Sequence, residues 1–261
     1  MLDLCLSSIN LEILQHRFSI AWHYRFDSIT SRYVHPYIFS GLRSPFIHLN
    51  HQSKTRSLLT ELQRFDEHTF WHSLDTFILG SIIADRLHFS NLEEFGLGCL
   101  LHDTGKLFIP NALLTKPGLL NESERAQLKL HTNYGYHLLK QQGFSEEVAR
   151  MARDHHERLD QSGYPYALPA AWITKPVRLI SIVDVFSALT LNRPYRNGLL
   201  PQHAFQYMFK DLSCIDHSYL SELCTTVGTY PIGAQVRLSN GRCATVTSVD
   251  SNDPTCIQIK L

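Results

Sequence analysis

Apolar residues recur at helical spacing through the middle of the chain. Leu58, Leu59 and Leu62 lie on one face of a segment that starts near residue 54, and a second apolar stripe runs from residue 72 to residue 87. Side chains spaced three and four residues apart share one face of an α-helix. The pattern therefore predicts two helices that pack against a common core.

Capping and breaking residues divide the rest of the central chain into further helices. Ser90 with Glu93 predicts a capping box that opens a helix toward residue 101. Asn121 to Glu124 opens a longer helix that we expect to run to about residue 141. The remaining helices are predicted to start at Ser145, Pro176, Pro201 and Asp216.

Two segments depart from this pattern. Residues 160–169 hold a glycine and two prolines, so an ordered loop is expected there. After residue 228 apolar and polar residues alternate around a turn at 239–241, which predicts a β-hairpin, with residues 256–261 as a third strand. The fold class is mainly α: an N-terminal region of unreadable role (1–53), a helical domain (54–228) and a C-terminal β-hairpin extension (229–261).

Composition narrows the functional classes. Lys plus Arg and Asp plus Glu both total 24, so the overall charge favours neither DNA binding nor a funnel for acidic substrates. Any selectivity for anions must therefore be local. The start of the chain lacks the pattern of a signal peptide, and no window is long and apolar enough for a membrane span, so we expect a soluble cytoplasmic protein.

Histidine is unusually frequent, with 15 residues. Those near predicted helix ends or on helix faces combine with two aspartates into one set of candidate metal ligands: His72, His102, Asp103, His131, His155, His156 and Asp184. Imidazole and carboxylate donors without thiolate suit a catalytic iron, manganese or zinc ion better than a structural zinc. Seven donors exceed what one open catalytic ion needs, so two ions bridged by Asp103 are expected. The alternative is a helical domain whose histidines are structural.

At these residues the sequence resembles the HD-GYP subgroup of the HD-domain metal-dependent phosphohydrolases. The resemblance covers residues 66 to 261 and rests on ordered strings: His72-Ser73, Leu101-His-Asp-Thr-Gly-Lys106, Lys116-Pro-Gly118, His155-His-Glu-Arg158, Gly163-Tyr-Pro165, Asp184-Val-Phe-Ser-Ala-Leu-Thr190 and Arg193-Pro-Tyr-Arg196. It implies an HD-domain helical bundle in which the seven candidate residues bind two metals, iron first, manganese as the alternative and zinc less favoured. Some members carry a third metal through a glutamate where this chain has His68, which favours two.

The resemblance implies a bacterial second-messenger phosphodiesterase that hydrolyses cyclic di-GMP to the linear dinucleotide, to GMP, or to both, by attack of a metal-activated hydroxide. Asp103 and Lys106 would be catalytic, with Lys106 also holding a phosphate oxygen. Arg193, Arg196 and Tyr164 would bind substrate. The Gly163-Tyr164-Pro165 loop is open to three interpretations: substrate stacking, docking of a signalling protein, or a plain structural turn.

Two departures from the family pattern bear on these expectations. Ser187 replaces a usual aspartate, which would weaken the orientation of its partner, and Gln161 replaces a usual glycine in the loop. Two functional alternatives stay open: hydrolysis of 3′,3′-cyclic GMP-AMP at the same site, and a noncatalytic signalling module. The sequence leaves the oligomeric state open.

Overall fold

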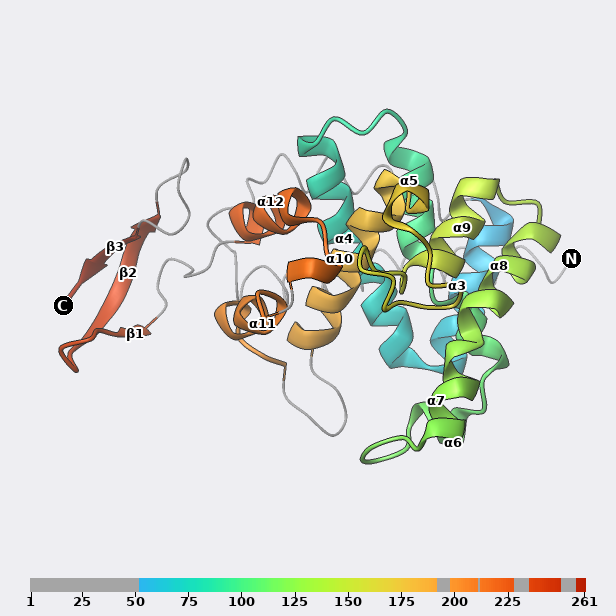
Figure 1. The fold of residues 1–261 in the computed structure, drawn as a ribbon, viewed down its shortest axis with the longest axis horizontal. Coiled ribbons are helices and arrows are strands. Elements are labelled where there is room, and N and C mark those ends of the chain that lie inside the picture. Colours follow the sequence, from blue (N-terminus) through green and yellow to red (C-terminus); the bar gives the residue numbers. More distant parts are fainter. Residues whose placement is uncertain (1–51, 192–197, 211, 228–234, 250–256) are drawn as a thin grey trace, which may run out of the picture.

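A computed structural model describes residues 52–191, 198–210, 212–227, 235–249 and 257–261. Helices make up most of the described residues from 52 to 227, and a small antiparallel sheet follows them (Figure 1). The predicted mainly α class is confirmed. The N-terminal region expected over residues 1–53 falls almost wholly outside the described residues.

The order of the described elements follows the sequence pattern closely. The α-helices are α3 (Ser53–Phe65), α4 (Glu67–Arg86), α5 (Leu92–Leu101), α6 (Asn111–Leu114), α7 (Glu122–Lys129), α8 (His131–Gln141), α9 (Glu146–Asp154), α10 (Lys175–Thr190), α11 (Pro201–Met208) and α12 (His217–Val227). Short 3-10 helices occur at η1 (Thr104–Phe108), η2 (Ala170–Trp172) and η3 (Leu212–Cys214), and none of these was predicted.

Helix α4 forms the centre of the bundle, and it is buried on almost every side. It packs against α3, α5 and α10, and its Phe77 is buried with Phe95 of α5 and Phe186 of α10. Burying a side chain of this size contributes about 1.5–3 kcal/mol. The same packing brings the polar residues of α4 and α10 into the interior, where they need partners.

Two predicted boundaries were wrong in detail. The N-cap of α5 is Asn91 and not Ser90, because the Asn91 side chain accepts from the Glu94 backbone N–H at 3.1 Å. The predicted helix from Asn121 to residue 141 is two helices that break at Leu130, although its capping box between Asn121 and Glu124 is present. The break turns the chain so that His131 begins a new helix.

The C-terminal strands form one antiparallel sheet in the order β1 (Gln235–Arg237), β2 (Cys243–Val249) and β3 (Ile257–Lys260). Gly241 has a φ of +82°, a conformation that glycine adopts without strain in the predicted turn. The hairpin and the third strand are therefore confirmed. Among the described residues, none of the helices is both long and apolar enough to cross a bilayer.

Candidate metal centre

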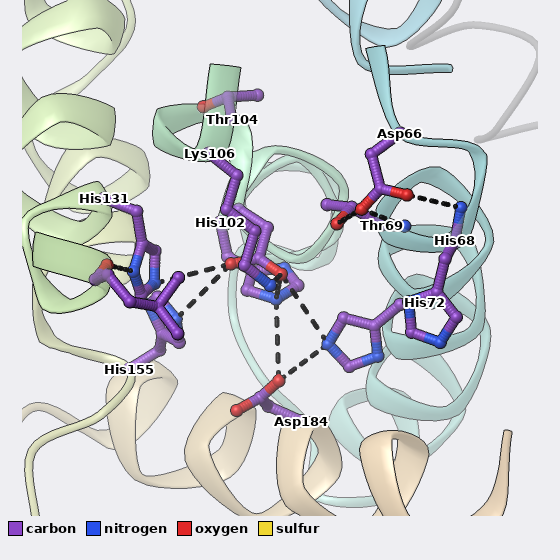
Figure 2. Close-up of polar contacts among 12 residues, drawn as sticks. Asp66, His68, Thr69, His72, His102, Thr104, Lys106, His131, His155 and Asp184 are labelled. Carbon is purple, nitrogen blue, oxygen red and sulfur yellow. Dashed lines mark hydrogen bonds and ion pairs between the residues drawn. The ribbon is translucent and has the colours of Figure 1, made fainter. Parts of the chain in front are cut away.

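The seven candidate ligands come together in the interior of the helical bundle. They are supplied by five parts of the chain: α4 (His72), the two residues that follow α5 (His102, Asp103), the start of α8 (His131), the two residues that follow α9 (His155, His156) and α10 (Asp184). Figure 2 labels five of the seven, all except Asp103 and His156, and the side chains of these five point toward one another. His68, one turn before His72, belongs to none of the three groups of potential ligands found among the described residues.

Asp103 lies between two sets of histidines. Its Oδ2 atom is 3.4 Å from His102 Nε2 and 3.9 Å from His72 Nε2, whereas its Oδ1 atom is 3.5 Å from His131 Nε2 and 3.9 Å from His155 Nε2. The two carboxylate oxygens therefore face different imidazoles. This is the arrangement expected of a carboxylate that bridges two cations.

Asp184 completes one of these sets. Its Oδ1 atom is 2.8 Å from His72 Nε2 and 3.7 Å from His102 Nε2, and its Oδ2 atom is 3.7 Å from His156 Nδ1. The donors thus form two groups of three joined by a third. In each group the ligand atoms lie within 4.8 Å of one another: His72, His102 and Asp184; His131, His155 and His156; and, between them, His102, Asp103 and His155.

Three of the histidine rings are held by helix-end carbonyls. The last carbonyls of a helix have no N–H partner within the helix. Nδ1 of each ring reaches one of them: His102 to Cys99 O at 2.9 Å, His131 to Leu128 O at 2.7 Å and His155 to Ala152 O at 3.0 Å. A carbonyl only accepts, so Nδ1 carries a proton in each of these rings. When such a ring is neutral, its Nε2 presents a lone pair, the state in which imidazole ligates a metal.

The opposite ends of these rings lack partners. Nε2 of His102, His131 and His155 and Oδ1 of Asp103 are buried and accept no hydrogen bond from any described residue. A buried polar atom without a partner costs roughly 1–3 kcal/mol. Because four such atoms converge on one place and all are good ligands, the residues fit a metal centre.

The charges of the cluster favour the binding of a cation. Burial alone would raise the pKa of Asp103, but Lys106 and His102 hold it well below its usual range. Burial likewise opposes ionisation of Asp184, yet its contacts with His102 and His72 keep its pKa well below normal. Both carboxylates are therefore anionic near neutral pH.

The imidazoles respond to burial in different ways. Burial lowers the pKa of His131 to about 4 and that of His155 to about 3, so both rings are neutral at pH 7. Burial also disfavours a charged His102, but the negative charges of Asp103 and Asp184 outweigh it and raise the pKa of His102 to about 10. Without a cation, a proton on His102 offsets part of the carboxylate charge.

Lys106 lies where the sequence places it, one turn after Asp103. Its Nζ atom is 2.5 Å from Asp103 Oδ2, and the side chain is half-buried. The ammonium therefore reaches the cluster from the side that solvent can enter. Arg193 and Arg196, the predicted substrate contacts, lie outside the described residues.

The Gly163-Tyr164-Pro165 loop packs directly on the cluster. The ring centroid of Tyr164 is 4.6 Å from that of His156 at an interplanar angle of 32°, and the Tyr164 N–H donates to the His156 carbonyl at 3.2 Å. A Cβ on Gly163 would lie 2.5 Å from His156 O, so only glycine permits this approach. The loop therefore contacts a candidate ligand, which a plain surface turn would not do.

Sequence reasoning missed the role of Glu157 beside the site and left the partner of Ser187 unnamed. The Glu157 carboxylate is buried and accepts from the Tyr166 N–H at 2.7 Å and the Leu168 N–H at 2.9 Å, which fixes the far side of the loop. Ser187 Oγ lies 3.0 Å from His72 Nδ1. The sequence shows both residues next to motif positions, but their partners are distant along the chain and only the fold reveals them.

Comparison with known proteins decides the family. The family model described as "HD domain" matches residues 50–217, which is most of the chain and contains every candidate ligand. The chain belongs to the HD-domain family. The recognition made from the motifs is thereby confirmed as far as the HD-domain family is concerned.

Several curated relatives of this HD domain are bacterial phosphodiesterases. A protein of Pseudomonas aeruginosa named cyclic di-GMP phosphodiesterase is 34% identical over 76% of this chain and 48% of its own length. A Vibrio cholerae protein named 3′3′-cGAMP-specific phosphodiesterase 1 is 44% identical over 44% of this chain and 27% of its own length. The chain thus spans less than half the length of these relatives.

A solved structure shows the same fold. The crystal structure of the HD domain of the Listeria monocytogenes phosphodiesterase PgpH, in complex with cyclic di-AMP, has a TM-score of 0.52. It is 19% identical and covers 66% of this chain and 93% of that one, a likeness that speaks for the fold alone.

Proposed function

We propose that this HD domain is a metal-dependent phosphodiesterase that hydrolyses a cyclic dinucleotide, with cyclic di-GMP as the leading substrate. The observation that carries the proposal is the pair of three-donor groups on either side of Asp103. Relatives named cyclic di-GMP phosphodiesterase from Pseudomonas aeruginosa and Xanthomonas campestris support the substrate.

The cluster would hold two transition-metal ions. His72, His102 and Asp184 would bind one, and His131, His155 and His156 the other, with Asp103 between them. We propose iron, with manganese as the alternative and zinc less favoured, as the resemblance to the HD-GYP subgroup implies. Imidazole and carboxylate donors accept several first-row ions, these among them. Such ions supply Lewis acidity, which activates water and offsets the charge of a phosphodiester.

The chain's own residues prepare the site for this reaction. Asp103 and Asp184 are kept anionic, and His131 and His155 are kept neutral with their lone pairs directed inward. Lys106 contacts Asp103 and is only half-buried, so we assign it to a nonbridging phosphate oxygen of the substrate. Burial of the surrounding residues excludes bulk water and strengthens these interactions.

We assign the other substrate contacts to Tyr164, Arg193 and Arg196. Tyr164 offers an aromatic ring beside His156, and Lys129 Nζ lies 4.8 Å from its centroid, so aromatic and cationic groups meet at the loop. Arginine forks suit phosphate oxygens and guanine edges. The contact between Tyr164 and His156 favours a role at the site over docking of a signalling protein.

A second substrate, 3′,3′-cyclic GMP-AMP, would use the same residues. Relatives named 3′3′-cGAMP-specific phosphodiesterases favour it, one of them 44% identical over the matched part. Kinetics on both dinucleotides under the same conditions will separate the two, because the specific substrate should show the higher kcat/KM.

The test of the proposal combines metal content with turnover. Protein purified anaerobically should contain two equivalents of transition metal and should hydrolyse the dinucleotide, whereas Asp103→Ala should lose both. Asp216→Asn is the matched control, since Asp216 contacts Arg178 and Ser218 and no ligand. Metal-loaded protein without turnover of any cyclic dinucleotide would refute the proposal.

A further inference from the structure

His72 is oriented differently from the other ligand histidines. It lies inside α4, where each carbonyl accepts from the N–H four residues further on, so no free carbonyl is within reach of its Nδ1. His102, His131 and His155 avoid this problem because each follows a helix end. The orientation of His72 must therefore come from a side chain of another helix.

Ser187 supplies that contact. Its Oγ atom is 3.0 Å from His72 Nδ1, and the serine is fully buried, so water does not compete for the hydrogen bond. Ser187 follows Asp184 by three residues on α10, which puts both side chains on one face of the helix. Asp184 Oδ1 holds the other ring nitrogen at 2.8 Å. Helix α10 therefore contacts both nitrogens of the His72 ring.

A hydroxyl differs from a carbonyl in what it allows. A carbonyl only accepts, whereas a serine hydroxyl either donates or accepts. When Nε2–H of His72 donates to Asp184, Ser187 donates to the bare Nδ1. When Nε2 instead offers its lone pair to a cation, Nδ1–H donates to Ser187. The serine satisfies the ring in both tautomers.

The two halves of the cluster are consequently unequal. Nε2 of His131 and of His155 has no hydrogen-bond partner among the described residues, so a cation there displaces nothing. Nε2 of His72 is already engaged by Asp184, and this contact must break before the ring can bind an ion. Ligation by His72 therefore costs a hydrogen bond and a change of tautomer.

We propose that Ser187 is a positioning residue that lets His72 change tautomer, and that the ion held by His72, His102 and Asp184 is the weaker and later-bound of the two. The inference rests on the proposed metal-dependent function. Ser187, which is not one of the seven ligands, would thus set the affinity of this ion and leave the affinity of the other ion unchanged.

The experiment is a titration of the full chain, freed of metal, with Mn²⁺. Wild type should bind two ions with distinct affinities. Ser187→Ala should weaken the second ion about 10- to 100-fold and leave the first unchanged, as expected for loss of a group that orients a ligand. Ser187→Thr, which keeps the hydroxyl, should restore the second affinity. Ser181→Ala is the control, because Ser181 is a buried serine of α10 whose hydroxyl donates to the Arg178 carbonyl of its own helix.

A second measurement reports the tautomer directly. In ¹⁵N spectra of the metal-free protein, Ser187→Ala should shift only the His72 ring nitrogens, because a purely structural change would disturb neighbouring rings as well. The inference is overturned if Ser187→Ala binds both ions as tightly as wild type, or if Ser187→Thr behaves like Ser187→Ala. Failure of wild type to bind any Mn²⁺ would instead refute the proposed function.

Discussion

The imidazoles of the cluster make the stability of the metal-free protein depend on pH in two opposite ways. His131 and His155 have pKa values of about 4 and 3, below the ordinary 6.5, so the folded state binds fewer protons than the unfolded state below pH 6.5. The contribution of these two rings to the free energy of unfolding is therefore lost as the pH falls below 6.5. His102, with a pKa of about 10, binds its proton more tightly when folded, so its contribution is lost as the pH rises from 6.5 toward 10.

Thermal unfolding in the presence of a chelator should therefore show a maximum in Tm near pH 6.5. We expect Tm at pH 5 to be lower by about 5 °C or more, since 1 kcal/mol corresponds to roughly 2–4 °C in a domain of this size. His131→Gln removes one of the titrating rings, so it should reduce the fall of Tm below pH 6.5 and leave the fall above pH 6.5 unchanged. A Tm that is constant between pH 5 and pH 6.5 would contradict the depressed pKa values.

At the scale of elements, the approach of η1 to α8 sets the distance between Asp103 and His131. A Cβ on Gly105 would lie 1.8 Å from the His131 carbonyl oxygen, whereas a Cβ on Gly135 would be 3.3 Å from Gly105 N and 3.4 Å from Ala152 Cβ. Gly105→Ala must push the two elements apart. Gly135→Ala needs only a small adjustment.

We expect Gly105→Ala to destabilise the protein by about 3 kcal/mol or more, at the upper end of the cost of overpacking, and to reduce bound metal. Gly135→Ala is the matched control at the same contact. It should destabilise the protein by less than half as much as Gly105→Ala, and the variant should retain its bound metal. Urea unfolding and elemental analysis measure both effects. Equal stability of the two variants would show that the contact does not position Asp103.

The loop of residues 160–169 depends on one buried carboxylate. Glu157→Gln keeps a carbonyl for one of the two backbone N–H groups but turns an NH₂ toward the other, so Tyr166 or Leu168 loses its acceptor. Hydrogen exchange at these two amides should accelerate about tenfold, the equivalent of 1.4 kcal/mol. Metal content should not change, because the hydrogen bonds of the Glu157 carboxylate go to loop N–H groups and not to a candidate ligand. Glu122→Gln, on the outer face of α7, is the control.

Local signals in the sequence account for most elements but not for how they meet. Capping residues at Asn121 and Ser145 and the proline at 176 act within one turn, so the helices they start could be predicted. The break at Leu130 could not, because nothing local distinguishes it from a helix interior. The short η1 helix was missed for the same reason: its backbone packs against α8 through a contact distant in sequence.

At the scale of the whole molecule, the site exists only when five parts of the chain are in place. The identity of the ligands could be predicted because their residue types and family strings are visible in the sequence. The grouping around Asp103, the orphaned nitrogens and the contact of Ser187 with His72 could not, since each joins residues from different helices. Metal binding to such a cluster requires the folded arrangement of all five parts, so it is expected to stabilise the folded state as a whole.

Metal removal should therefore destabilise the whole helical domain and not a single loop. A ligand that binds only the folded state stabilises it by about 2.7 kcal/mol at a concentration 100 times its Kd. Stripping the metal with a chelator should thus lower Tm by at least about 5 °C, and adding Mn²⁺ back should restore it. Asp103→Asn keeps the size of the side chain but loses its charge, so its Tm should barely respond to chelator. If the chelator lowered the Tm of wild type and of Asp103→Asn by the same amount, the stabilising metal would have to bind elsewhere in the protein.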